Sequence, residues 1–75
     1  MAITEIAADI IRAHFAGISL PAEMSLGPGV HITDLPRFVD TQIERLESGP
    51  PMLRRLAFGA LATIAEKLGH PFPIG

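Results

Sequence analysis

Glycine and proline interrupt the chain at three places, and these interruptions limit the length of any helix. They lie within residues 17–29, at Gly49-Pro50-Pro51 and at Gly69. Glycine favours the end of a helix and proline cannot continue one, so each place is a predicted break. Between the breaks, apolar residues recur every three or four positions, which is the period of an amphipathic helix. The sequence therefore predicts a single helical domain over residues 1–75, with helices at about 4–16, 34–48 and 51–68.

Polar residues mark where the first two helices begin. Thr4 is the predicted N-cap of the first helix, and either Thr33 or Asp34 can cap the second, because short polar side chains accept hydrogen bonds from free N–H groups. Pro36 then falls in the first turn of the second helix, where its missing N–H costs nothing. His14 continues the apolar stripe of the first helix, either as a partly buried structural histidine or as a ligand contact.

The segment between the first two helices, residues 17–33, is rich in apolar residues for a loop. Residues 18–20 and 30–32 alternate apolar and polar side chains, so two short extended pieces can pair across the turn. An isolated pair of strands is marginally stable in water, so we expect a packed, mostly irregular loop. The expected fold is all-α: three helices, a long apolar loop between the first and second, and an extended proline-rich tail at residues 70–75.

The third predicted helix is apolar around almost its whole circumference. A helix of this kind is buried on more than one side, and two other helices in so short a chain can cover only one. We therefore expect a symmetric homo-oligomer with its interface at Leu56, Gly59, Ala60 and Thr63. The alternative for Gly59 is a tolerated interruption of the helix, which costs about 1 kcal/mol relative to alanine.

Several classes of protein are disfavoured by what the sequence lacks. It has no cysteine, no phosphate-loop or metalloprotease motif and no closely spaced histidines, so we expect no metal, no cofactor and no enzymatic activity. The net charge of −2 leaves no basic footprint for DNA or RNA. No apolar run reaches the roughly 18 residues that cross a membrane. Glu5 and Asp9 precede every basic residue, unlike a secretion signal, so a cytoplasmic location is expected.

One group of polar residues predicts an anion-binding site. The start of the second helix carries a histidine, a threonine and an arginine, and the first turns of the third carry two arginines. The helix dipole disfavours cations at an N-terminal end, so the arginine pair is either neutralised by a carboxylate, such as Glu44 or Glu47, or held for an anion. Helix N-termini combined with arginine bind phosphate and carboxylate groups well. The predicted ligand-binding residues are His31, Thr33, Arg37, Arg54 and Arg55.

The block PGVHITDLPRFVDTQIERLESGP, which begins at Pro28, resembles a small family of unknown function from bacteria and their phages. The shared pattern is P-G-V-x-I-T-D-x-x-x-F-V, followed by a helix with I-x-x-L and a glycine or asparagine stop. The resemblance covers Leu20 to about Gly49, and the alanine-rich third helix departs from the more basic third segment of the family. It implies a small accessory protein, such as one encoded by a mobile element, and brings no reaction or catalytic residue.

Two functions follow from these features. The first is a non-catalytic, oligomeric binding module that sequesters a small anionic ligand, such as a signalling nucleotide, in the cytoplasm of the cell or of an infected host. The alternative is a protein–protein interaction module that docks a macromolecular partner through the third helix and the C-terminal tail. The arginine pair discriminates the two, because only the first function requires its charge.

Overall fold

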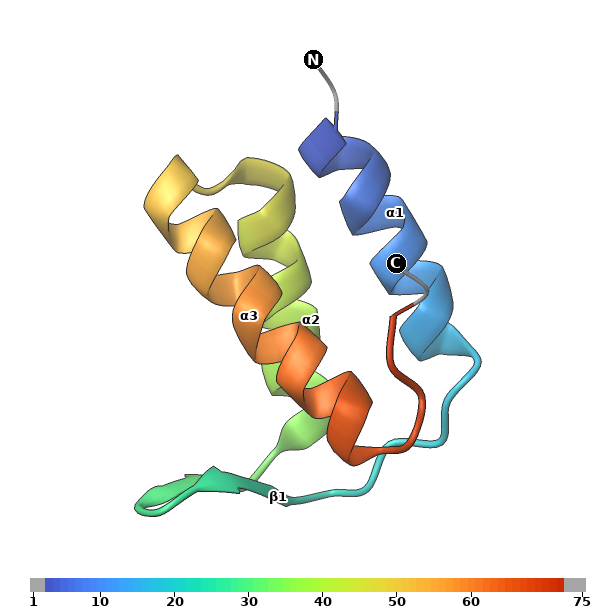
Figure 1. The fold of residues 1–75 in the computed structure, drawn as a ribbon, viewed down its shortest axis with the longest axis vertical. Helices are drawn as coiled ribbons and strands as arrows, with labels where there is room; N and C mark the ends of the chain where they lie inside the picture. Colours follow the sequence, from blue (N-terminus) through green and yellow to red (C-terminus); the bar gives the residue numbers. More distant parts are fainter. Residues whose placement is uncertain (1–2, 73–75) are drawn as a thin grey trace.

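The computed structural model describes the backbone of residues 3–72 and the side chains of residues 8–72. This part of the chain forms three helices and one two-stranded hairpin (Figure 1). The elements are, in chain order, α1 (Ile3–Ala16), β1 (Met24–Gly27), β2 (Val30–Ile32), α2 (Leu35–Ser48) and α3 (Pro51–Lys67). α2 packs against α1 and runs antiparallel to α3, and the hairpin lies beyond the end where α2 begins (Figure 1).

The helix ends agree with the predicted ranges to within one residue. Of the two predicted caps for α2, the structure uses Asp34, whose carboxylate accepts a hydrogen bond from the N–H of Arg37 at 3.4 Å. Gly49 is the C-cap of α2, and its N–H donates to the carbonyl of Arg45. The predicted cap at Thr4 lies outside the residues whose side chains are described.

The core follows from the apolar stripe of each helix. Its members recur at intervals of three and four, so they share one side of their helix and meet between the helices. Alanine at two of the buried positions in α3 leaves room for α2 to pack closely. The buried apolar residues are Ala8, Ile11, Phe15, Leu35, Val39, Ile43, Leu46, Ala57, Leu61, Ile64 and Ala65.

The prediction of an all-α fold with an irregular loop is wrong, because part of that loop is an antiparallel hairpin. β2 lies where residues 30–32 were expected to extend, but its partner is β1 and not residues 18–20. The pairs in the sheet are Met24 with Ile32, Ser25 with His31 and, after a one-residue shift in register, Gly27 with Val30.

Two physical features stabilise this hairpin. Gly29 in the turn has φ 76°, in the left-handed region that glycine adopts without a steric penalty. The hairpin is also not isolated, since Met24, Leu26 and Ile32 are partly buried against the helical core. This packing supplies the stabilisation that a lone pair of strands lacks in water.

The C-terminal tail turns back after α3 and runs toward α1 (Figure 1). Gly69, with φ 80°, makes the turn, and Phe72 packs against the core. The tail that the sequence analysis expected to be extended therefore contacts its own chain through Phe72, whereas Ile74 lies outside the described residues.

Candidate binding surface

The first half of α3 leaves large apolar side chains in contact with solvent. Met52 is 75% exposed, Leu56 65% and Leu53 39%. Met52 and Leu56 also line a shallow, open hollow together with Pro51 and Arg55. Burying apolar side chains is favourable by roughly 1.5–3 kcal/mol each, so this surface can support binding. We call the solvent-facing side of this helix the α3 outer face: Met52, Arg55, Leu56, Gly59 and Thr63.

The second half of the α3 outer face has small side chains, and its one side-chain hydroxyl already has a hydrogen-bond partner. A Cβ atom added to Gly59 would meet nothing within 4 Å, so no other part of the described chain approaches this glycine. The hydroxyl of Thr63 donates to the carbonyl of Gly59 at 2.9 Å and is satisfied within the helix. Of the predicted interface residues, Leu56, Gly59 and Thr63 are exposed and Ala60 is partly buried.

One arginine of the predicted pair, Arg55, belongs to the α3 outer face, and the other, Arg54, precedes it in the helix. Arg55 is exposed and lines the hollow, whereas Arg54 is partly buried and its Nε atom is buried without a hydrogen-bond partner. Neither arginine forms an ion pair with a carboxylate in the part of the chain that the structure describes. The predicted neutralisation by Glu44 or Glu47 is therefore not found there.

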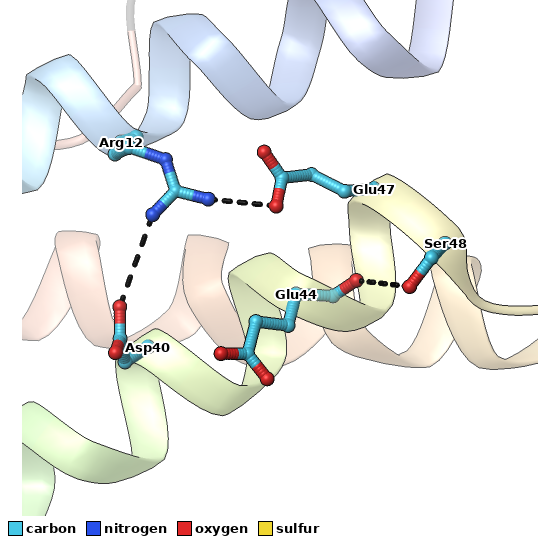
Figure 2. Close-up of polar contacts among 5 residues, drawn as sticks. All are labelled: Arg12, Asp40, Glu44, Glu47 and Ser48. Atoms are coloured by element: carbon cyan, nitrogen blue, oxygen red, sulfur yellow. Dashed lines mark hydrogen bonds and ion pairs between the residues drawn. The ribbon is translucent and has the colours of Figure 1, made fainter.

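Glu47 instead binds an arginine of α1 that the sequence analysis did not single out. The Nη2 atom of Arg12 lies 2.8 Å from Oε1 of Glu47, and its Nη1 atom lies 3.9 Å from Oδ1 of Asp40 (Figure 2). The hydrogen bond to Glu47 raises the pKa of the Arg12 guanidinium above its ordinary value, and the nearby charge of Asp40 adds to the effect. Figure 2 shows Arg12 reaching from α1 across to the acidic side of α2, so this group joins two helices.

The other predicted ligand-binding residues lie at the opposite end of the α2–α3 pair. His31 is in β2, where its Nε2 atom lies 2.8 Å from Oε1 of Glu23. Thr33 is exposed just before α2, and Arg37 is exposed in the first turn of that helix. These three side chains thus share the hairpin end of the molecule.

The five predicted residues therefore form two groups within one chain. α2 separates them, and its 14 residues make a helix about 21 Å long at about 1.5 Å per residue. One group holds Arg54 and Arg55, and the other holds His31, Thr33 and Arg37. A single small ligand does not contact both groups in one subunit.

A group of aromatic rings also escaped the sequence analysis. His14, in the last turn of α1, is half-buried on the side of the helix that meets the tail. Its Nε2 atom lies 2.6 Å from the carbonyl oxygen of His70. Its ring meets Phe15 and Phe72 edge-on, with centroids 5.9 Å and 5.2 Å away. These contacts give His14 a structural role within the single chain. Spacing within α1 gave no signal for the contacts with His70 and Phe72, because these residues come from the other end of the chain.

Two further features bear on chemistry. Among the described residues, His, Asp and Glu side chains do not gather in groups of three as a metal site requires. No helix within residues 3–72 has the length and apolarity of a membrane span.

Comparison with known proteins places the chain in a family. No curated protein and no solved structure matches it. Residues 1–57 match a family described as a domain of unknown function, DUF6965, and the match ends within the first half of α3. Since this match covers most of the sequence, the chain belongs to the DUF6965 family.

Proposed function

We propose that the protein is a non-catalytic binding module that assembles with copies of itself and captures a small anionic ligand where subunits meet. The observation that carries this proposal is the arginine pair at the α3 outer face. Arg54 has a buried Nε atom without a partner, and Arg55 lines an apolar hollow. A buried polar group without a partner costs free energy, so this position of Arg54 is not explained by stability alone. The other guanidinium nitrogens of Arg54 and those of the exposed Arg55 can donate to an anion.

The charges on α3 favour an antiparallel pairing with a second copy. Arg55 and Glu66 are both exposed and lie about three helical turns apart on nearly the same side of the helix. In an antiparallel pair centred between Ala60 and Leu61, each Arg55 lies opposite Glu66 of the second copy. A parallel pair would instead place like charges opposite each other, which is unfavourable.

An antiparallel pair would also bring together the two groups of predicted ligand-binding residues. α2 and α3 run antiparallel within a subunit, so the hairpin end lies beside the end of α3 (Figure 1). In the pair, the hairpin end of one subunit would approach the start of α3 in the other. His31, Thr33 and Arg37 of one copy would then lie at the same end as Arg54 and Arg55 of its mate.

The ligand class of this proposal comes from the same features, and its biological setting comes from the resemblance to a family of bacteria and their phages. A nucleotide combines phosphate groups, which arginine binds well, with an apolar base that exposed side chains can cover. We place the protein among the accessory proteins of phages or mobile elements, where it would sequester a signalling nucleotide in the host cytoplasm.

A thermal-shift screen against cyclic and linear nucleotides tests the proposal. A ligand at 100 times its Kd should raise the free energy of unfolding by about 2.7 kcal/mol. The shift should disappear in the double variant Arg54→Ala and Arg55→Ala, and should persist in Arg45→Ala, which removes an exposed arginine elsewhere. A screen without any shift, or a shift that survives the double variant, rejects ligand capture at this site.

The second candidate function is the docking of a different protein on the α3 outer face. The exposure of Met52 and Leu56 beside an open hollow favours it. The tail is a poorer docking element than the sequence implied, because Phe72 packs against its own chain. Under this function Leu56→Asp abolishes partner binding, whereas the double arginine variant leaves it largely intact.

A further inference from the structure

The last described segment of the chain packs one aromatic ring against three other rings. We call this segment, residues 70–72, the C-terminal strap. The ring of Phe72 lies 5.2 Å from that of His14, 5.8 Å from that of Phe15 and 5.9 Å from that of Phe58, measured between centroids. The first two contacts are edge-to-face, the arrangement that aromatic pairs prefer. Rings from α1 and α3 thus form a seat for one aromatic side chain.

A hydrogen bond fixes the backbone of the strap beside this seat. The Nε2–H of His14 donates to the carbonyl oxygen of His70 at 2.6 Å. Because a carbonyl only accepts, the contact requires the proton on Nε2 of the imidazole. The side chains of α1 and α3 therefore contact two parts of an extended chain, a carbonyl group and the aromatic ring two residues further on. Pro71 stands between them and favours the extended backbone that joins the two contacts.

The strap is attached to the fold by few contacts. Its first residue is anchored, since the N–H of His70 donates to the carbonyl of Ala65 at 3.0 Å. Beyond that point, His70 and Pro71 are exposed and Phe72 is only partly buried. The fully buried core residues come from the helices and do not include Phe72. Release of the strap would therefore leave the helical core in place.

We propose that the groove formed by His14, Phe15 and Phe58 is a peptide-binding site whose resting occupant is the C-terminal strap. Its ligand is an extended peptide with an aromatic residue directly after proline and a free carbonyl group directly before that proline. Recognition of a pre-extended, proline-containing segment by aromatic side chains is a recurring binding mode. Phe58 follows Arg54 and Arg55 by one turn of α3, but the site uses neither arginine charge, so it does not depend on the function proposed above.

The strap makes the site autoinhibited. An occupant joined to its site by a short turn has an effective concentration in the millimolar range. A free peptide must compete with this occupant. The apparent affinity of the protein for the peptide is therefore reduced in proportion to the fraction of molecules in which the strap is released. A change that removes the ring of Phe72 but leaves the groove intact should expose the site.

Fluorescence polarisation with a labelled peptide tests this inference on the full chain. The probe is His-Pro-Phe-Pro-Ile-Gly, the sequence of residues 70–75. The Phe72→Ala variant should bind it at least tenfold more tightly than the unaltered protein. A probe with alanine in place of its phenylalanine should not bind, and Phe58→Ala added to Phe72→Ala should abolish binding. The double arginine variant, Arg54→Ala with Arg55→Ala, should bind the probe as the unaltered chain does, which separates this site from the anion site.

Two results overturn the inference. One is a Phe72→Ala variant that keeps its helical circular dichroism but binds the probe no better than the unaltered chain. If that variant loses its helical signal, isotope-labelled unaltered protein is titrated with unlabelled millimolar probe while the ring resonances of its own Phe72 are followed by NMR. Resonances of Phe72 that do not move under these conditions are the second contradicting result.

Discussion

The Nε2 atom of His14 lies 2.6 Å from the carbonyl oxygen of His70, although 56 positions separate the two residues in the chain. This hydrogen bond joins the last turn of α1 to the segment that follows α3. It also orients the imidazole against the ring of Phe72, which lies 5.2 Å away between centroids. The two ends of the described chain are therefore connected through one side chain and not only through the core.

Replacement of His14 by phenylalanine tests how much this hydrogen bond contributes. The variant keeps an aromatic ring in the groove but removes the donor, so the free energy of unfolding should fall by about 1 kcal/mol. Urea denaturation followed by circular dichroism measures the change. His70→Ala is the matched control, because the acceptor is a backbone carbonyl that this change retains. Equal losses in both variants would show that the bond does not contribute as the geometry implies.

The choice of Asp34 over Thr33 as the cap of α2 gives a second prediction. The Asp34 carboxylate accepts from the N–H of Arg37, and loss of an N-cap side chain typically costs about 1 kcal/mol. Asp34→Ala should lower the urea midpoint accordingly, whereas Thr33→Ala should leave it nearly unchanged. The opposite order of effects would assign the cap to Thr33.

Gly29 and Gly27 form a matched pair for testing the hairpin. A Cβ atom at either glycine would meet nothing within 4 Å, but only Gly29 has a positive φ. Gly29→Ala should therefore destabilise the protein by roughly 1–2 kcal/mol, the cost of placing an L-residue in the left-handed region. Gly27→Ala should be neutral or slightly stabilising. Chemical denaturation of the two variants in parallel gives the comparison. Similar changes in the free energy of unfolding would mean that the turn adopts another conformation that accepts alanine.

Local signals in the sequence predict the three helices, but they do not predict the hairpin. Gly49 and Pro50 end α2 through properties of their own backbone, so the break could be located without knowledge of the fold. The pairing of β1 with β2 depends instead on the packing of Leu26 and Ile32 against the helices. That stabilisation comes from residues distant in sequence, and intrinsic strand preference does not include it.

The candidate site was predictable as a set of residue types but not as an arrangement. The sequence placed Arg54 and Arg55 near a helix start, and the structure confirms that position. Which carboxylate each arginine meets depends on how the helices are oriented around their axes. Glu47 faces Arg12 of α1, and no periodicity within α2 could have indicated that partner.

The ion pairs of Arg12 predict a dependence of stability on salt. Both carboxylates and the guanidinium are substantially exposed, so their interaction is screened by dissolved ions. Arg12→Ala should lower the melting temperature slightly in low salt, and the difference from the unaltered protein should shrink as salt rises toward about 1 M, where the Debye length is about 3 Å. Arg45→Ala, measured under the same conditions, is the control, because it removes an exposed arginine from α2 and leaves Arg12 in place. A difference that stays constant with salt would assign the effect to packing of the Arg12 stem.

The α3 outer face predicts the oligomeric state and what abolishes it. At micromolar concentration, sedimentation should show a species heavier than the 8.0 kDa chain, since self-association would cover the exposed Met52 and Leu56. Leu56→Asp should shift the protein to the monomer by placing a charge in the contact, and Gly59→Leu should do so by blocking close approach of the helices.

Both substituted positions are exposed to solvent in the single chain, so neither change should unfold it, and circular dichroism checks this. Glu44→Gln, an exposed change on α2, should leave the mass of the assembly unaltered. A species of 8 kDa for the unaltered protein would leave the α3 outer face available only to a different partner.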